Sequence, residues 1–243
     1  MHAADLYAET HGRVAALVAD LDPALAVPAC PGWTVRDVVA HVVGLAADIV
    51  SGRVDGYAGE EWTEVQVRER AGRSLQELLA EWDELLPAFI EINRDLAASA
   101  LPELIPHVLG PLPKAMFEAA FHVDLLHHEH DLLGAAGAPR TVPTPADIAV
   151  MKSQLANVRL QFKTAGLPTL RLIERDLGQT WDIGRDEPAA TLTGTAIDFL
   201  RSFGGRRTLA EIAELDWQGE SEGMADHVIL PFFHAPAEPI PGG

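Results

Sequence analysis

The chain has 243 residues, of which 48% are hydrophobic and 6% aromatic, which allows one large domain or two small ones with aliphatic cores. Its 36 acidic and 18 basic side chains give a formal net charge of -18. Such an acidic surface would repel the phosphates of nucleic acids and of anionic membranes, so we expect neither as a partner.

Cys30 is the one cysteine of the chain, which rules out an intrachain disulfide and favours a reducing compartment. The first ten residues, MHAADLYAET, lack the basic and apolar regions of a signal peptide. No apolar run reaches the roughly 18 residues that a membrane helix needs. We therefore expect a cytoplasmic monomer or homodimer whose partners are small molecules.

The first half of the chain predicts a bundle of amphipathic helices joined by short or proline-rich loops. The four long helical segments are residues 2–20, 34–50, 74–98 and 114–137. Thr34 is a good N-cap for the second segment, with Asp37 three residues later in a capping-box position. A shorter helix is expected to restart at Thr63.

The second half of the chain mixes helices with short strands. A helix at about 146–165 precedes the β-like runs PTLRLIER, QTWDIG and AATLTG, a helix in GTAIDFLRSFGGRR and a further strand candidate, VILPFF. The predicted fold class is α+β: an antiparallel four-helix bundle over residues 1–142 and a small α+β domain over 143–243.

Polar side chains interrupt the apolar face of the fourth predicted helix. Steps of 4, 3, 4 and 3 place five residues on this face: Phe117, Phe121, Asp124, His128 and Asp131. Burying an unpaired carboxylate costs several kcal/mol, so Asp124 and His128 need partners. Because they are four residues apart, Asp124 and His128 lie on the same face of the helix and can bind the same metal ion.

The second predicted helix carries His41 within the stripe Val38, His41, Leu45 and Ile49. If both stripes face the bundle axis, His41, Asp124 and His128 converge on a three-ligand divalent-metal site with open positions, as catalytic sites have. A hydrogen-bonded core histidine is the alternative, and Glu118 with His122 is a rival i,i+4 pair. Cys30 is read as a structural residue of the turn, with a reactive thiol as the alternative.

Three segments resemble the mycothiol-dependent maleylpyruvate isomerase-like proteins, a family within the DinB-like metal-binding four-helix bundles. CPGWTVRDVVAHVVG resembles the first signature of the family and HHEHDLLGAAGAP the second. WDIGRDEPAATLTGTAIDFLRSFGGRR resembles its sterol-carrier-like C-terminal domain. The resemblance implies metal ligands at His41, Asp124 and His128, although the characterised isomerase type carries glutamate at the position of Asp124.

The resemblance also implies a function. Mycothiol would act as a metal-bound thiolate in isomerisation or S-transfer on a small electrophilic, anionic substrate. The ion would be zinc, with nickel, iron or manganese as alternatives. An arginine of the second domain would assist, and Arg206 within LRSFGGRR is our candidate, against an ordinary surface arginine. Metal-assisted hydrolysis and a non-enzymatic binding protein, with an apolar cavity around AATLTG and VILPFF, remain alternative functions.

Overall fold

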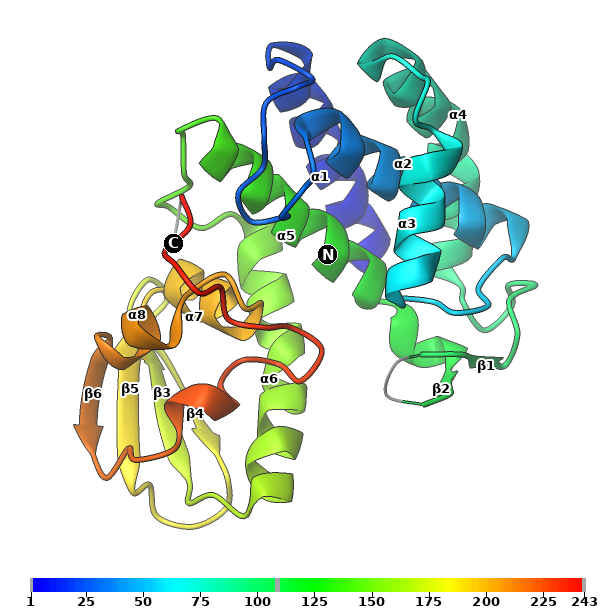
Figure 1. The fold of residues 1–243 in the computed structure, drawn as a ribbon. Helices are drawn as coiled ribbons and strands as arrows, with labels where there is room; N and C mark the ends of the chain where they lie inside the picture. The colour runs from blue at the N-terminus through cyan, green and yellow to red at the C-terminus, as the bar shows by residue number, and fades with distance from the viewer. Residues whose placement is uncertain (1, 108–109, 242–243) are drawn as a thin grey trace. The chain divides into compact units, whose positions relative to one another are not determined.

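The computed structural model describes residues 2–107 and 110–241 and has the predicted α+β class. The chain divides into two compact units, Met1–Ala136 and Gly137–Gly243 (Figure 1). Within the described residues, no helix combines the length and the apolar character that a membrane crossing requires.

The first unit contains the four predicted bundle helices and one shorter helix. Their bounds are Ala3–Ala19 (α1), Val35–Ser51 (α2), Glu60–Glu69 (α3), Leu75–Arg94 (α4) and Ala120–Ala135 (α5). Thr34 caps α2 in the predicted capping box with Asp37, and Ser74 caps α4 in the same way with Glu77. The short helix α3 begins three residues before the predicted restart at Thr63.

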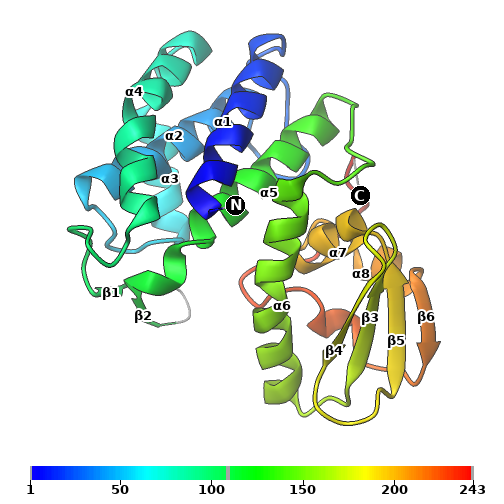
Figure 2. The ribbon, with the colours of Figure 1, turned by 180° about the vertical axis from the view of Figure 1, so that it is seen from behind.

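The helices of the first unit enclose a continuous apolar core. Helix α1 packs against α4 and α5, and α2 packs against α3 and α4 (Figure 2). Trp82, Phe89 and Phe121 are fully buried in this core. Burying such large side chains supplies the main stabilisation of the bundle, because the hydrophobic free energy scales with the apolar area removed from water.

The connection between α4 and α5 differs from the prediction. Helix α4 ends at Arg94 rather than near residue 98, because the Asp95 side chain accepts a hydrogen bond from Ala98 N (2.9 Å) in a competing turn. Two short strands, Leu104–Ile105 (β1) and Leu112–Pro113 (β2), then pair antiparallel. A 3-10 turn, Lys114–Phe117 (η1), replaces the predicted start of the fourth helix.

Lys114 explains why the helix begins late. Its buried ammonium donates to Ser99 O (3.0 Å) and Leu101 O (3.3 Å), which ties the start of η1 to the preceding segment. The regular α5 therefore begins at Ala120, and Phe117 lies on η1, with its ring centroid 6.3 Å from that of Phe121.

Helix α3 lies unusually close to α2, at Gly44. A Cβ atom at Gly44 would lie 2.5 Å from Gln66 Cβ and 2.8 Å from Gln66 Cγ. Real Cβ atoms do not approach other carbons this closely, so the contact requires glycine. The close approach places the fully buried Gln66 against the helix that carries His41.

The second unit is a four-stranded sheet with helices. Its elements are Pro145–Ala165 (α6), Leu170–Glu174 (β3), Gln179–Ile183 (β4), Ala190–Gly194 (β5), Ala196–Phe203 (α7), Leu209–Ala213 (α8), Asp216–Gly219 (β6) and Ala225–His227 (η2). The strand order is β4-β3-β5-β6, with β3 and β5 parallel and the two outer pairs antiparallel. Helix α6 packs against α7 and β4.

The expected strand in VILPFF, residues 228–233, is wrong. This segment follows η2 and runs as turns and irregular chain. Leu230 N donates to Phe203 O (3.0 Å) and Gln161 donates to Ile229 O (2.8 Å), so helices rather than a neighbouring strand satisfy its backbone. Pro231 has no N–H for a strand ladder. Strand β6 instead forms one edge of the sheet, opposite β4, in a segment for which the sequence predicted no strand.

The close approach at Gly44 generates a matched pair of stability predictions. We expect Gly44→Ala to lower the free energy of unfolding by about 1–3 kcal/mol, because the added methyl group collides with Gln66. Gly12→Ala, in α1, meets nothing within 4 Å and is expected to be neutral or stabilising by up to about 1 kcal/mol. Urea denaturation of both variants checks this. Equal effects of the two changes would contradict the packing argument.

Candidate metal centre

The structure brings His41, Asp124 and His128 together inside the first unit. One ligand atom from each lies within 4.8 Å of the others. His41 Nε2 is 3.4 Å from Asp124 Oδ2, and His128 Nε2 is 3.7 Å from Asp124 Oδ1. Helices α2 and α5 therefore present two imidazoles to one carboxylate, as the two stripes predicted.

Burial differs among these three side chains. The side chains of His41 and His128 are 5% and 10% exposed, whereas that of Asp124 is 33% exposed. The Trp33 ring covers both histidines, with centroid distances of 5.3 Å to His41 and 6.3 Å to His128. The cluster is therefore closed by protein around the imidazoles and open to solvent at the carboxylate.

A buried hydrogen-bond chain holds the His41 ring. His41 Nδ1 lies 2.7 Å from Gln66 Oε1, and Gln66 Nε2 donates to Asp48 Oδ2 at 2.7 Å. Arg53 Nε donates to Asp48 Oδ1 at 2.6 Å and closes the chain at the surface. Because an amide oxygen only accepts, Nδ1 carries the proton and Nε2 keeps its lone pair toward Asp124.

A second carboxylate holds the His128 ring in the same way. His128 Nδ1 is 3.2 Å from Asp131 Oδ2, whose side chain is fully buried. This contact assigns the proton to Nδ1 and leaves the lone pair of Nε2 facing Asp124. The sequence had placed Asp131 on this face without a role, and it had not identified Gln66 or Asp48 as partners of His41.

The donor set suits a divalent ion. Two neutral imidazole nitrogens and one carboxylate are ligands that zinc and neighbouring transition metals accept. Both rings are oriented by hydrogen bonds from their other nitrogen, the usual outer-shell arrangement of metal-binding histidines. The three residues therefore fit the metal that the sequence resemblance implies, with protein ligands on one side and solvent access on the other.

Burial and charge act in opposite directions on His41. Burial lowers the pKa of His41 by disfavouring the imidazolium. The charge of Asp124, the hydrogen bonds of His41 to Asp124 and Gln66, and the charge of Asp48 raise the pKa and together outweigh burial. The pKa of His41 therefore lies above the usual value of 6.5 in the metal-free protein.

The two residues of the rival pair, Glu118 and His122, contact different residues at the N-terminal end of the chain. Glu118 Oε1 lies 3.4 Å from His2 Nε2, and His122 Nε2 lies 3.2 Å from the Thr10 hydroxyl. Glu118 thus contacts the N-cap residue of α1, and His122 contacts a residue within α1. Among the described residues, neither of them belongs to a group of three or more metal-ligand atoms.

Arg206 belongs to the second unit and follows α7. Its guanidinium donates to Gly204 O at 2.8 Å and lies 5.3 Å from the centroid of the Phe233 ring. These contacts orient the side chain beside its own loop.

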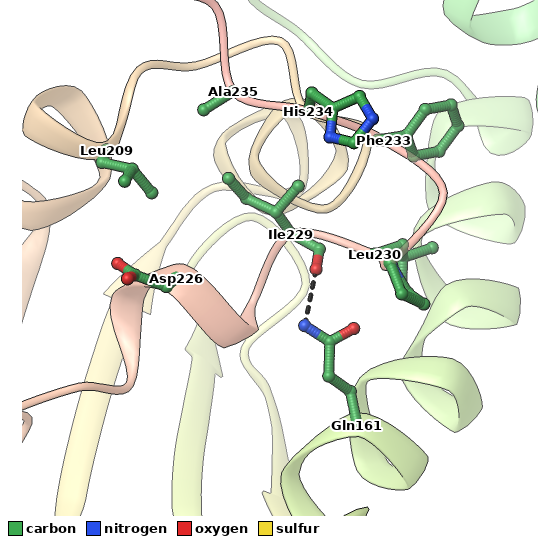
Figure 3. Close-up of a pocket in the computed structure, with 9 residues that line it drawn as sticks. Gln161, Leu209, Asp226, Ile229, Leu230, Phe233, His234 and Ala235 are labelled. Atoms are coloured by element: carbon green, nitrogen blue, oxygen red, sulfur yellow. Dashed lines mark hydrogen bonds between the residues drawn. The ribbon is translucent and has the colours of Figure 1, made fainter. Parts of the chain in front are cut away.

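The second unit also contains a small open pocket between α6, α8 and residues 226–235 (Figure 3). Its volume is about 250 Å³, and Gln161 donates across its base to Ile229 O. Small-molecule sites usually begin at roughly 300 Å³, so this pocket alone does not supply the large apolar cavity of the binding-protein alternative.

The raised pKa of His41 gives a pH prediction for the metal-free protein. We expect NMR titration to place His41 above 6.5, and Asp124→Asn to lower its pKa, because the largest opposing charge is lost. A histidine whose pKa is raised by folding stabilises the fold fully below its unfolded pKa. The stability advantage of the wild type over Asp124→Asn should then fall as the pH rises through the folded pKa of His41.

Asp83→Asn is the matched control, because Asp83 lies 3.3 Å from another buried histidine, His11. It should leave the titration of His41 unchanged. A His41 pKa at or below 6.5 in the wild type, or an equal effect of both substitutions, would contradict the assigned contact with Asp124.

The first unit matches a known protein family. Residues 6–133 match the family described as "Mycothiol maleylpyruvate isomerase N-terminal domain". A crystal structure of the mycothiol-dependent maleylpyruvate isomerase superposes with a TM-score of 0.58 at 14% identity, covering 84% of this chain and 88% of that one. A mutant of that isomerase gives 0.57 at 13% identity, with the same coverage.

No curated protein matches this chain. At 13–14% identity, the two crystal structures establish a shared fold, which agrees with the predicted DinB-like bundle and its C-terminal domain. The family match is the stronger finding, because it spans more than half of the chain and includes His41, Asp124 and His128. The chain belongs to the mycothiol maleylpyruvate isomerase N-terminal domain family.

Proposed function

We propose that this protein is a divalent-metal-dependent enzyme that uses a low-molecular-weight thiol, mycothiol, in isomerisation or S-transfer on a small electrophilic, anionic substrate. The observation that carries the proposal is the convergence of His41, Asp124 and His128 inside the segment that matches the family. A bound divalent ion would lower the pKa of a coordinating thiol and so supply a thiolate at neutral pH.

The protein's own residues prepare this site. Gln66 and Asp131 hold the two rings in the tautomer whose Nε2 is unprotonated, so no rotation of the rings is needed before ligation. Trp33 shields the imidazoles from water on one side. The partly exposed Asp124 marks the side from which a thiol and a substrate can approach.

Aspartate in place of the family's glutamate is compatible with the proposal. Asp124 is one methylene shorter, yet its two oxygens already lie 3.4 Å from His41 Nε2 and 3.7 Å from His128 Nε2. The spacing of α2 and α5 therefore suits the shorter side chain. Zinc is our first choice of metal, with nickel, iron and manganese as alternatives that accept the same donors.

Arg206 is the proposed cation for the anionic group of the substrate. A guanidinium binds a carboxylate through two parallel hydrogen bonds, and stacking on Phe233 restricts its motion before binding. In a chain with a net charge of -18, an anionic substrate needs such a local positive charge.

Metal content tests the ligand set. We expect about one equivalent of divalent metal in the purified wild type and its loss in His41→Ala and in Asp124→Ala, because a site with two protein ligands binds weakly. Inductively coupled plasma mass spectrometry measures this. His122→Ala, a buried histidine on the same helix as Asp124, should keep the metal. Metal retained in both ligand variants would refute the assignment.

Thiol binding tests the proposed chemistry. Isothermal titration of the zinc-loaded protein with mycothiol should show binding that disappears in the metal-free protein and in Asp124→Ala, because the proposed sulfur ligand needs the ion. Equal binding with and without zinc, or none to the zinc-loaded protein, would argue against a metal-dependent thiol enzyme.

The role of Arg206 is tested with a small dicarboxylate as the probe. Arg206→Gln should weaken its binding roughly ten- to hundredfold, which corresponds to losing hydrogen bonds to a charged group. Arg159→Gln, an exposed arginine of the same unit, should leave the affinity unchanged. Equal affinities of the wild type and Arg206→Gln would remove Arg206 from the proposal.

A further inference from the structure

A second group of metal-ligand atoms lies on the other side of the His128 ring. It consists of Cys30 Sγ, His128 Nδ1 and Asp131 Oδ2. We propose that these three atoms form a second divalent-metal site, with a thiolate ligand, that is distinct from the centre at His41, Asp124 and His128.

The distances among the three atoms are those of a tetrahedral ion's ligands. Cys30 Sγ is 3.7 Å from His128 Nδ1 and 3.6 Å from Asp131 Oδ2, and His128 Nδ1 is 3.2 Å from Asp131 Oδ2. Ordinary zinc bond lengths predict corresponding edges of roughly 3.6, 3.6 and 3.4 Å in a tetrahedral site. An ion can therefore enter with shifts of a few tenths of an ångström.

The backbone holds these side chains in place. His128 and Asp131 are one turn apart on α5, and the Asp131 side chain is fully buried. Cys30 lies in a closed turn, in which Cys30 N donates to Val27 O and Trp33 N donates to Cys30 O, both at 2.9 Å. The partly exposed Cys30 provides the route by which an ion reaches the two buried ligands.

The donor set selects the class of ion. A thiolate, an imidazole and a carboxylate favour zinc, cobalt or cadmium over magnesium or calcium, which prefer oxygen ligands. Binding requires Cys30 to release its thiol proton to solvent. It also requires His128 to change tautomer, so that the proton on Nδ1 moves to Nε2, which faces the Asp124 carboxylate. With three protein ligands, the fourth position is open to water or an added ligand.

The two sites share one imidazole. His128 Nε2 faces Asp124, whereas Nδ1 faces Asp131 and Cys30. An ion at the second site takes the nitrogen and the carboxylate that orient His128 toward the first. The sites therefore compete for His128, and disabling the first site should make the second easier to fill.

Cobalt titration of the metal-free protein tests the second site. Because Cys30 is the one cysteine in the chain, any cobalt–thiolate charge-transfer band in the near ultraviolet reports on this site alone. The titration uses a phosphine rather than a thiol as reductant. We expect the band in the wild type, its loss in Cys30→Ser, and its appearance at lower cobalt in His41→Ala.

Two substitutions on α5 provide a matched pair. Asp131→Asn should weaken cobalt binding at the thiolate at least tenfold, whereas Asp124→Asn should keep the band. Absence of the band in both wild type and His41→Ala, with cobalt in excess and circular dichroism showing folded protein, would overturn the inference. Metal bound by the wild type without this band would leave the proposed function intact and remove only the second site.

Discussion

Helix α2 buries a histidine in an apolar bundle, and a buried imidazole needs partners for both ring nitrogens. His41 meets this requirement at Nδ1 with Gln66. Its Nε2 faces Asp124, which is a partner for the imidazolium form or for an ion that both side chains bind. The first contact fixes the tautomer, and the second brings α5 to the same point. Several other features position the Gln66 side chain that holds this ring. Helix α3 packs closely on α2 at Gly44, and Gln66 donates to the buried Asp48, which in turn accepts a hydrogen bond from Arg53 at the surface.

His128 shows the same construction with a carboxylate in place of the amide. Asp131 holds its Nδ1, so both imidazoles direct an unprotonated Nε2 toward Asp124. This arrangement is expected for a metal centre, in which several ligands converge on one point. Histidines that only fill space in a core have no need to converge on one partly exposed carboxylate. The exposure of Asp124 leaves the chemistry accessible, while the oriented rings stay protected.

Much of this arrangement could be predicted from the sequence. The helical periodicity and the cap at Thr34 predicted α2, and the polar positions within the apolar stripes of two helices indicated that His41, Asp124 and His128 converge. Gln66 could not be predicted, because its position depends on how closely α3 packs on α2. Cys30 is similar: its place beside Asp131 depends on the course of a loop, for which sequence periodicity carries no information.

The errors have physical causes as well. The run VILPFF has the composition of a strand, but Pro231 and hydrogen bonds to α6 and to the end of α7 keep it out of the sheet. The late start of α5 follows from the buried Lys114, whose ammonium donates to the carbonyl groups of Ser99 and Leu101. These carbonyl groups are too distant in sequence to belong to the same helix. Local patterns predicted the elements, and tertiary hydrogen bonds decided where they end.

We propose above all that His41, Asp124 and His128 hold a metal ion. A crystal of the zinc-loaded protein, measured on both sides of the zinc absorption edge, tests it most directly. We expect an anomalous peak at roughly 2.0–2.2 Å from His41 Nε2, His128 Nε2 and an Asp124 oxygen. A zinc-loaded crystal with no peak there, and with both histidines bonded only to protein groups, would contradict it.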